Sequence, residues 1–111
     1  MKSYQELRQL IDQRLDKIEY LFEAKSLYSP IEYILSLKAK RIRPVLLLMA
    51  HQLFSENLKK AISPAIGIEI FHNFTLLHDD IMDNASVRRG YETVHEKWNN
   101  NTAILSGDAM L

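Results

Sequence analysis

The sequence predicts an all-α protein, and three observations support this fold class. Only 3 Gly and 3 Pro occur in 111 residues, and no segment alternates β-branched and polar residues as a strand would. Apolar residues instead recur at spacings of three and four, which is typical of helices packed through one face. Hydrophobic residues make up 47% of the chain and charged residues 25%, as in a globular protein rather than a disordered one.

The first half of the chain contains signals for three helices. Residues 4–23 carry one apolar stripe at helical spacing, which predicts a first helix. A second is predicted over residues 29–37, because Ser29 can cap it, Pro30 suits a first turn and Glu32 completes a capping box. A third begins at a proline and covers residues 44–54. It is apolar nearly all round, so we expect it to be central.

The second half begins with a long helix that is predicted from Pro64 to Asp83. The residues 84–86, Asn-Ala-Ser, should break it. A short helix over residues 94–98 and another from Thr102 onward follow, separated by an Asn-rich turn. The last helix is still apolar where the sequence stops, so we interpret the chain as the N-terminal part, residues 1–111, of a longer all-α domain. The alternative is a chain that ends on a docked helix.

Composition excludes several classes of protein. Lys plus Arg equals Asp plus Glu at 14 each, and no basic stripe with interleaved aromatic residues occurs, so a nucleic-acid partner is not expected. The absence of cysteine excludes disulfides and thiolate metal sites. The apolar run over residues 45–50 is too short for a membrane span. The N-terminal segment is polar and unlike a signal peptide, so we expect a cytoplasmic protein.

Two helix ends carry charges that the helix dipole disfavours. Lys40, Arg41 and Arg43 crowd the start of the third helix, where the dipole is already positive. Each misplaced charge costs about 0.3–1 kcal/mol, and sequences often break local preferences at functional sites. An anion would relieve this end, because free N–H groups and basic side chains point at one spot. The alternative interpretation is a solvated basic loop paired with surface acids.

The second such end is acidic. Asp79, Asp80 and Asp83 lie in the last turn of the long helix, where three carboxylates at these spacings are expected to converge. Mg²⁺ suits them, because it binds one or two carboxylates and leaves positions for waters and substrate phosphates. The aspartate pattern alone could be a solvated acidic helix end. The pair Arg88-Arg89, which can hold a phosphate through bidentate bonds, makes a diphosphate site more specific.

Two histidines precede the aspartates on the same helix. His72 lies seven residues before Asp79, two turns away on the same face. A histidine on a mostly apolar helix is more often an interior residue than a functional one. His78, next to Asp79, could support the metal site. Alternatively, His78 and Asp79 could be ligands of an HD-type metal phosphohydrolase, which is also all-α. That alternative leaves Asp83 and the arginine pair unexplained.

The order of these motifs resembles the trans-type (E-type) isoprenyl diphosphate synthases. The resemblance covers the chain from about Ala39 and rests on Lys-Arg-Ile-Arg-Pro at 40–44, Asp-Asp-Ile-Met-Asp at 79–83 and Arg-Arg-Gly at 88–90. It implies an isoprenoid synthase helical bundle, truncated here to its N-terminal helices. It also implies a Mg²⁺-dependent condensation of an allylic diphosphate with isopentenyl diphosphate, in a homodimer.

The resemblance also implies roles for individual residues. The isopentenyl diphosphate would be held by Lys40 and Arg43, together with His72 and Arg89. Catalysis at the allylic diphosphate would depend on Arg88 and on the Mg²⁺ site formed by Asp79, Asp80 and Asp83. The residues four and five before the first aspartate, Thr75 and Phe74, would set the floor of the product cavity. The bulky Phe74 resembles synthases of C15–C20 products.

Two departures limit what the resemblance implies. Ala39 stands where the family usually has glycine, and Glu92-Thr93 stands where it often has Pro-Thr. The family also carries a second aspartate-rich motif, and none is present in these 111 residues. We therefore expect the chain to be inactive alone. A non-catalytic helical partner or regulatory module is the main alternative.

Overall fold

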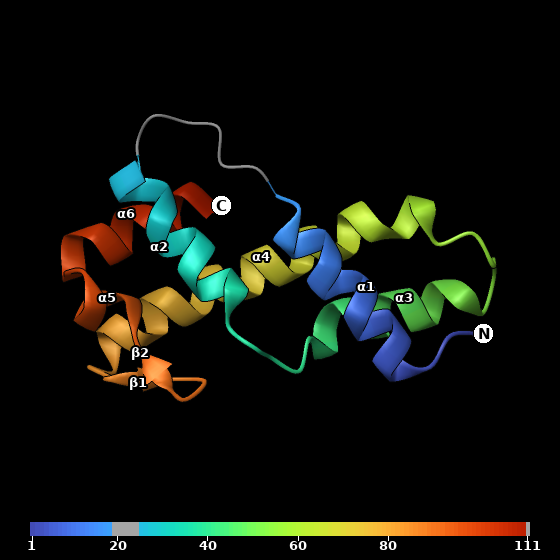
Figure 1. Ribbon diagram of the computed structural model, residues 1–111, viewed down its shortest axis with the longest axis horizontal. Helices are drawn as coiled ribbons and strands as arrows, with labels where there is room; N and C mark the ends of the chain where they lie inside the picture. Colours follow the sequence, from blue (N-terminus) through green and yellow to red (C-terminus); the bar gives the residue numbers. More distant parts are fainter. Residues whose placement is uncertain (19–24, 111) are drawn as a thin grey trace. The chain divides into compact units, whose positions relative to one another are not determined.

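The computed structural model describes residues 1–18 and 25–110, which contain helices and one short hairpin (Figure 1). The helices are α1 (Tyr4–Asp16), α2 (Lys25–Ser36), α3 (Ile42–Gln52), α4 (Lys59–Met82), α5 (Val94–Lys97) and α6 (Asn100–Met110). The chain divides into a first unit, residues 1–18 and 40–69, and a second unit, residues 19–39 and 70–111. The prediction of an all-α fold is confirmed, although the hairpin was missed.

The first unit is built from α1, α3 and the first part of α4. A capping box starts α1, in which the Ser3 amide donates to Glu6 and the Glu6 amide donates to the Ser3 hydroxyl. The buried stripe of α1 contains Leu7, Ile11 and Leu15, and this helix packs against α3. The prediction that this helix reaches residue 23 is wrong, because it ends at Asp16; residues 19–23 lie outside the described part.

The expectation that the third helix is central is also wrong. Only one face of α3 is buried, through Pro44, Val45 and Leu48. On its other side Leu46 is 57% exposed, and Phe54, just beyond the helix, is 90% exposed. A helix that is apolar all round can therefore still expose part of its surface in this chain.

Two prolines were wrongly predicted to open helices. Both α2 and α4 begin earlier, so that Pro30 and Pro64 each lie inside a helix. An interior proline loses one helical hydrogen bond and usually costs about 3 kcal/mol. Burial of the Pro30 ring offsets part of this cost. The true start signal of α4 is Asn57, whose side-chain oxygen accepts a hydrogen bond from the Lys59 amide at 3.1 Å.

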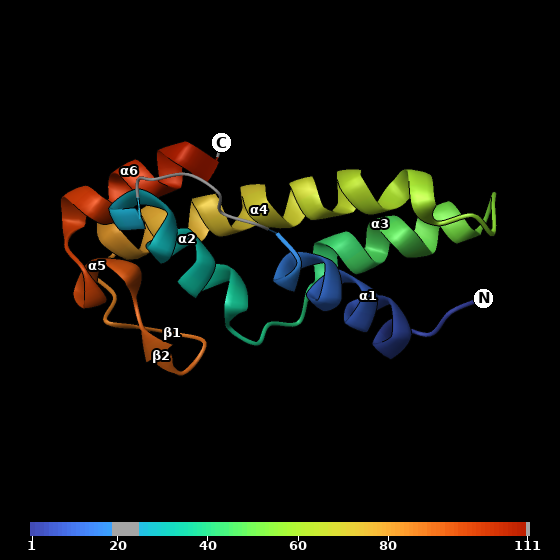
Figure 2. The same cartoon turned by 45° about the horizontal axis from the view of Figure 1, so that its top comes forward.

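The second unit contains α2, α5 and α6, which lie side by side in Figures 1 and 2. The Ser106 hydroxyl on α6 donates to the Leu27 carbonyl on α2 at 2.7 Å. The rings of Tyr33 and Trp98 meet edge to face at a centroid distance of 5.3 Å. The last helix starts two residues before the predicted Thr102, because the Asn99 side chain accepts a hydrogen bond from the Thr102 amide at 2.7 Å.

The end of α4 agrees with the prediction, because the helix stops at Met82. Asn84 has a left-handed φ of 53°, its amide donates to Ile81, and the Ala85 amide donates to Asp80. These two bonds form a Schellman cap, in which a left-handed residue closes the last turn. Asp79 and Asp80 therefore lie in the last turn of a well-terminated helix, and Asp83 directly follows it.

The missed element is the hairpin of β1 (Val87–Arg88) and β2 (Tyr91–Glu92). Its two loop residues, Arg89 and Gly90, have φ values of 56° and 80°, as a type I′ turn requires. Each strand has only two residues, so the sequence carries no alternating pattern that would predict it.

Candidate functional site

The acidic motif and the arginine pair meet at Asp80 and Arg88 in the second unit. The Arg88 guanidinium donates from Nε to Asp80 Oδ2 at 3.1 Å and from Nη2 to Asp80 Oδ1 at 2.5 Å. The Asp80 side chain is only 3% exposed, whereas that of Arg88 is 31% exposed. The hairpin thus returns the first arginine to the last turn of α4 in a bidentate ion pair.

The three carboxylates do not converge as the spacing alone indicated. Asp80 faces Arg88, whereas Asp79 and Asp83 are exposed. Among the described residues, no group of three or more His, Cys, Asp or Glu side chains could hold a metal ion. Asp79 and Asp83 offer two exposed carboxylates one helical turn apart, so this site needs further oxygen ligands to bind Mg²⁺.

The acidic surroundings act on Arg88. The bidentate hydrogen bond that Arg88 donates to Asp80 is the largest influence, and it raises the pKa of the Arg88 guanidinium. Burial opposes this effect, while the charges of Asp80, Asp79 and Asp83 add to it. Arg88 is therefore a permanent cation within an acidic cluster, with its orientation fixed by Asp80.

The second arginine faces a different element. Arg89 occupies the first position of the hairpin turn, and its guanidinium donates to the Ile34 carbonyl of α2 at 3.1 Å. It also lines a surface cavity of about 850 Å³ formed by α2, the following loop, the hairpin and α5. Lys38 and Lys97 also line this cavity, so its lining carries three cations and one acid, Glu92.

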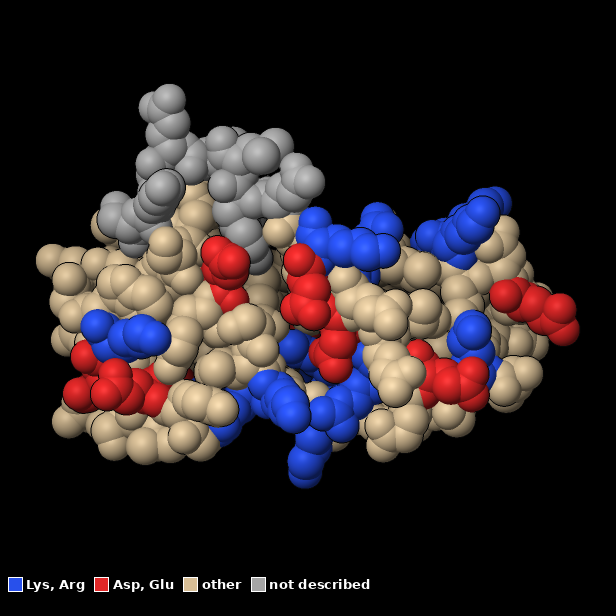
Figure 3. Space-filling view, viewed as in Figure 1, with Lys and Arg blue, Asp and Glu red and all other residues tan. Residues whose placement is uncertain are grey.

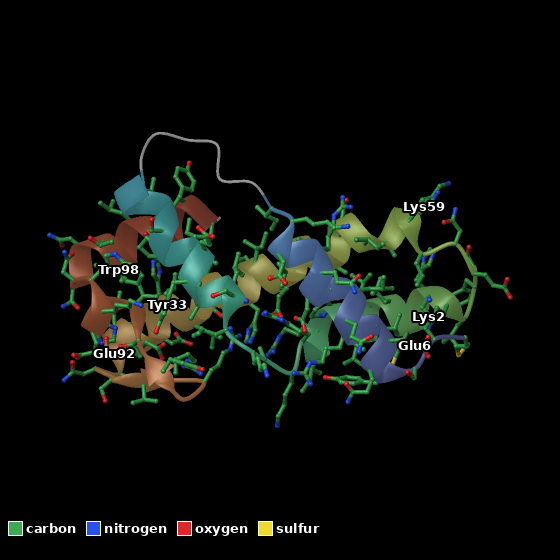
Figure 4. The ribbon with its side chains drawn as sticks, in the orientation of Figure 1. Lys2, Glu6, Tyr33, Lys59, Glu92 and Trp98 are labelled. Carbon is green, nitrogen blue, oxygen red and sulfur yellow. The ribbon has the colours of Figure 1, made fainter. Side chains whose placement is uncertain are left out.

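Tyr33 also lines this cavity, and Figure 4 shows it near Glu92 and Trp98. The Tyr33 hydroxyl donates to the Glu92 carbonyl at 2.8 Å, which fastens α2 to β2. Lys97 lies 4.2 Å from the Tyr33 ring centroid. Burial first, and then the charge of Glu92, raise the pKa of Tyr33, so it remains a hydrogen-bond donor at neutral pH. In the part of Figure 3 occupied by α5 and the hairpin, basic and acidic side chains lie next to one another.

The two histidines of α4 have different surroundings. His72 is half-buried, and its carbonyl accepts a hydrogen bond from the Thr75 hydroxyl at 2.5 Å. His78 Nε2 lies 3.2 Å from the Ile104 carbonyl oxygen, which can only accept, so this bond requires a proton on Nε2. That engagement does not support the phosphohydrolase interpretation, in which His78 would be a metal ligand.

The basic motif lies in the first unit and divides in two. Arg41 is 4% exposed; its Nε donates to Asp12 at 2.9 Å and its Nη1 to Glu69 at 3.3 Å. It therefore does not join Lys40 and Arg43 at one anion-binding spot, as the charge run alone indicated. Lys40 and Arg43 are exposed. The Lys40 carbonyl accepts a hydrogen bond from the Tyr4 hydroxyl, which holds the start of this motif against α1.

The charge run in the sequence did not predict that Arg41 is paired inside the first unit. The available signal was Glu69, a lone acid within the apolar stretch of residues 65–70. A buried carboxylate needs a charged or hydrogen-bonding partner. Arg41 has a left-handed φ of 55°, and its bonds to Asp12 and Glu69 hold it there.

Comparison with known proteins identifies relatives along the whole chain. The polyprenyl synthetase family model matches residues 24–111. A geranylgeranyl diphosphate synthase from Methanosarcina mazei is 38% identical over 100 residues, which are 90% of this chain and 31% of that protein. The chain spans about a third of the length of the curated relatives it matches.

Solved structures show the same relation. A geranylgeranyl pyrophosphate synthase matches 100% of this chain and 34% of its own chain, with 50% identity and a TM-score of 0.94. A heptaprenyl diphosphate synthase from Staphylococcus aureus matches 99% of this chain and 35% of its own, with 31% identity and a TM-score of 0.85. The chain belongs to the polyprenyl synthetase family, the trans-type isoprenyl diphosphate synthases that its motifs resemble.

Proposed function

We propose that this chain is the N-terminal part of a prenyltransferase that condenses an allylic diphosphate with isopentenyl diphosphate. The observation that carries the proposal is the end of α4, where Asp80 holds Arg88 in place and the charges of the exposed Asp79 and Asp83 act on the same arginine. This arrangement offers carboxylates for a divalent cation and a guanidinium for a diphosphate within one site. Relatives named as geranylgeranyl diphosphate synthases support the same reaction.

The donor set fits Mg²⁺. Asp79 and Asp83 supply two hard oxygen ligands, and substrate phosphates would complete the coordination. Bound Mg²⁺ would stabilise the negative charge of the departing diphosphate. Asp80 would act by positioning Arg88, whose guanidinium is held ready for the allylic diphosphate.

A second set of side chains would hold isopentenyl diphosphate. We assign this role to Lys40, Arg43, His72 and Arg89. Arg89 is fixed by its turn and by the Ile34 carbonyl, which limits the side-chain motion that would be lost on binding. Lys40 and Arg43 are exposed and so can reach an anion.

The experiment supplies the part of the relatives' length that this chain does not cover. A chimaera would join this chain to the remaining two-thirds of the Methanosarcina mazei enzyme, replacing the segment that it matches. We expect Mg²⁺-dependent product formation from the chimaera and none from the 111-residue chain alone. A folded chimaera without turnover would contradict the proposal and favour a non-catalytic module, whereas normal turnover by the chain alone would contradict its proposed incompleteness.

We further propose a C15–C20 product, with Phe74 at the floor of the product cavity. The relatives named for geranylgeranyl diphosphate support this length. The heptaprenyl relative has the same fold, so the fold alone does not determine length. In the chimaera, Phe74→Ala should lengthen the product measured by mass spectrometry, and an unchanged length would refute this assignment.

We also propose that the complete protein works as a homodimer in the cytoplasm. Exposed apolar side chains such as Leu105, which is 58% exposed, support contact with other protein surface. No described helix is long and apolar enough to cross a membrane. Sedimentation of the chimaera tests the dimer directly, since a monomer at micromolar concentration would exclude it.

A further inference from the structure

A line of three rings runs along α4 in the second unit and ends at α6. The ring centroids of Phe71 and Phe74 are 5.6 Å apart, and those of Phe74 and His78 are 4.7 Å apart with planes inclined at 67°. Residues at these spacings share one helix face. Phe71 is 55% exposed, so one end of the line is open. At the other end, His78 Nε2 lies 3.2 Å from the Ile104 carbonyl oxygen.

The closed end of the line rests on a glycine. Gly107 is buried, and a Cβ at this position would lie 2.6 Å from His78 Nε2 and 2.8 Å from His78 Cδ2. Such distances are shorter than real nonbonded contacts, so any side chain would displace the imidazole. Asp108, the next residue, places Oδ1 3.6 Å from the same nitrogen. Gly107 is therefore required because a side chain does not fit at this position. A helical backbone conformation alone would not require glycine.

A second helical glycine provides a comparison. Gly67 lies within α4, and a Cβ there would meet no atom within 4 Å. The two glycines share a helical backbone but differ in the space around the missing side chain. Gly67 is consequently a matched control for the backbone effect of a glycine-to-alanine substitution.

We propose that His78 and Gly107 are positioning residues that set the orientation of Phe74 and, through it, the length of the product. The proposal rests on the proposed function, because it takes the ring face of α4 to line the product cavity. The imidazole is fixed on one side by Gly107 and the Ile104 carbonyl, and on the other side it contacts the Phe74 ring. A displaced imidazole must therefore move the Phe74 ring or lose contact with it.

The first test measures the contact in the 111-residue chain. Gly107→Ala should lower the thermal unfolding midpoint by about 4–8 °C, whereas Gly67→Ala should leave it unchanged or raise it. In a His78→Ala background, Gly107→Ala should lose most of this effect, because the colliding ring is absent. An equal fall in both backgrounds would overturn the proposed contact.

The second test uses a readout that general destabilisation would not reproduce. In the chimaera described above, Gly107→Ala should change the product length distribution, Gly67→Ala should not, and Gly107→Ala combined with His78→Ala should differ from Gly107→Ala alone. An unchanged distribution in an active Gly107→Ala enzyme would overturn the positioning role while leaving the proposed reaction intact.

If the unsubstituted chimaera makes no product, the proposed function fails. The ring orientation is then judged from the carbon-bound proton shifts of His78 in nuclear magnetic resonance spectra of the 111-residue chain. Gly107→Ala must move these signals and Gly67→Ala must not.

Discussion

Replacing Arg88 with alanine should destabilise the chain more than replacing its partner Asp80 with asparagine. The Asp80 side chain is 3% exposed and would be left as a buried, unpaired charge. Removing one partner of a buried pair costs about 3–5 kcal/mol. Because Arg88 keeps 31% of its side chain exposed, we expect Arg88→Ala to lie at the lower end, about 3 kcal/mol.

Replacing the other partner, Asp80, leaves a different group without its ion pair. In Asp80→Asn the guanidinium remains, and its exposed part is solvated by water while the amide oxygen still accepts one bond. We therefore expect a loss of about 1–2 kcal/mol. The combined variant should cost less than the sum of the two, because each single change already breaks the same pair.

Urea unfolding followed by circular dichroism measures these differences. With a slope of about 1–3 kcal/mol per M, a loss of about 3 kcal/mol lowers the midpoint by about 1–3 M. Arg14→Ala is the matched control, since this exposed arginine in the last turn of α1 should change stability by less than about 0.5 kcal/mol. The reasoning is refuted if Asp80→Asn costs as much as Arg88→Ala, or if Arg88→Ala behaves like Arg14→Ala.

Three other predictions concern the first unit and the hairpin. Arg41→Ala should destabilise the chain by about 3–5 kcal/mol in urea unfolding, because it leaves the buried carboxylate of Glu69 without this cation; a change below about 1 kcal/mol would contradict it. The backbone amide of Ser3, and then its hydroxyl, lower the pKa of Glu6. The stability that Glu6 adds over Glu6→Gln should therefore be present above the unfolded-state pKa and disappear as pH falls through the lower folded-state value, which unfolding midpoints across pH 2–7 would test. Gly90→Ala should cost about 1 kcal/mol through its φ of 80° alone, since no atom lies within 4 Å of the added Cβ, and an unchanged midpoint would exclude this strain.

Helix signals in the sequence predicted where helices exist better than where they begin. The apolar stripe at helical spacing correctly indicated α1, because burying one face is the main stabilising term and leaves a regular pattern. The starts at Pro30 and Pro64 were wrong, because proline marks a first turn only when nothing upstream forms a better one. At α4 the side chain of Asn57 caps the helix earlier, and this short polar residue was overlooked.

The end of α4 was easier to predict than the hairpin that follows it. Asn84 tolerates a left-handed conformation, so a break at this position has a local cause. The hairpin depends instead on Arg89 adopting a left-handed φ of 56°, which is unfavourable for a long side chain. Its stabilisation comes from outside the turn, through the ion pair of Arg88 and the bond to Ile34. No local pattern could reveal such distant partners.

The sequence likewise predicted the charged motifs of the candidate site. It did not predict which charges are paired internally and which are exposed. In the basic motif Arg41 is buried against Asp12 and Glu69, while its neighbour Lys40 is exposed. In the acidic motif Asp80 is buried against Arg88. One charge in each motif thus faces an opposite charge from another part of its own unit.

This division has a physical reason. A run of like charges at a helix end repels itself, and the dipole adds to the cost. Pairing one member internally lowers that cost and fixes the backbone from which the remaining members project. Asp79 and Asp83 are then exposed from a turn held by Asp80 and by the cap at Asn84. The internal pair at Asp80 thereby keeps two carboxylates exposed at a helix end that would otherwise disfavour them, which is the condition that a cation and diphosphate site requires.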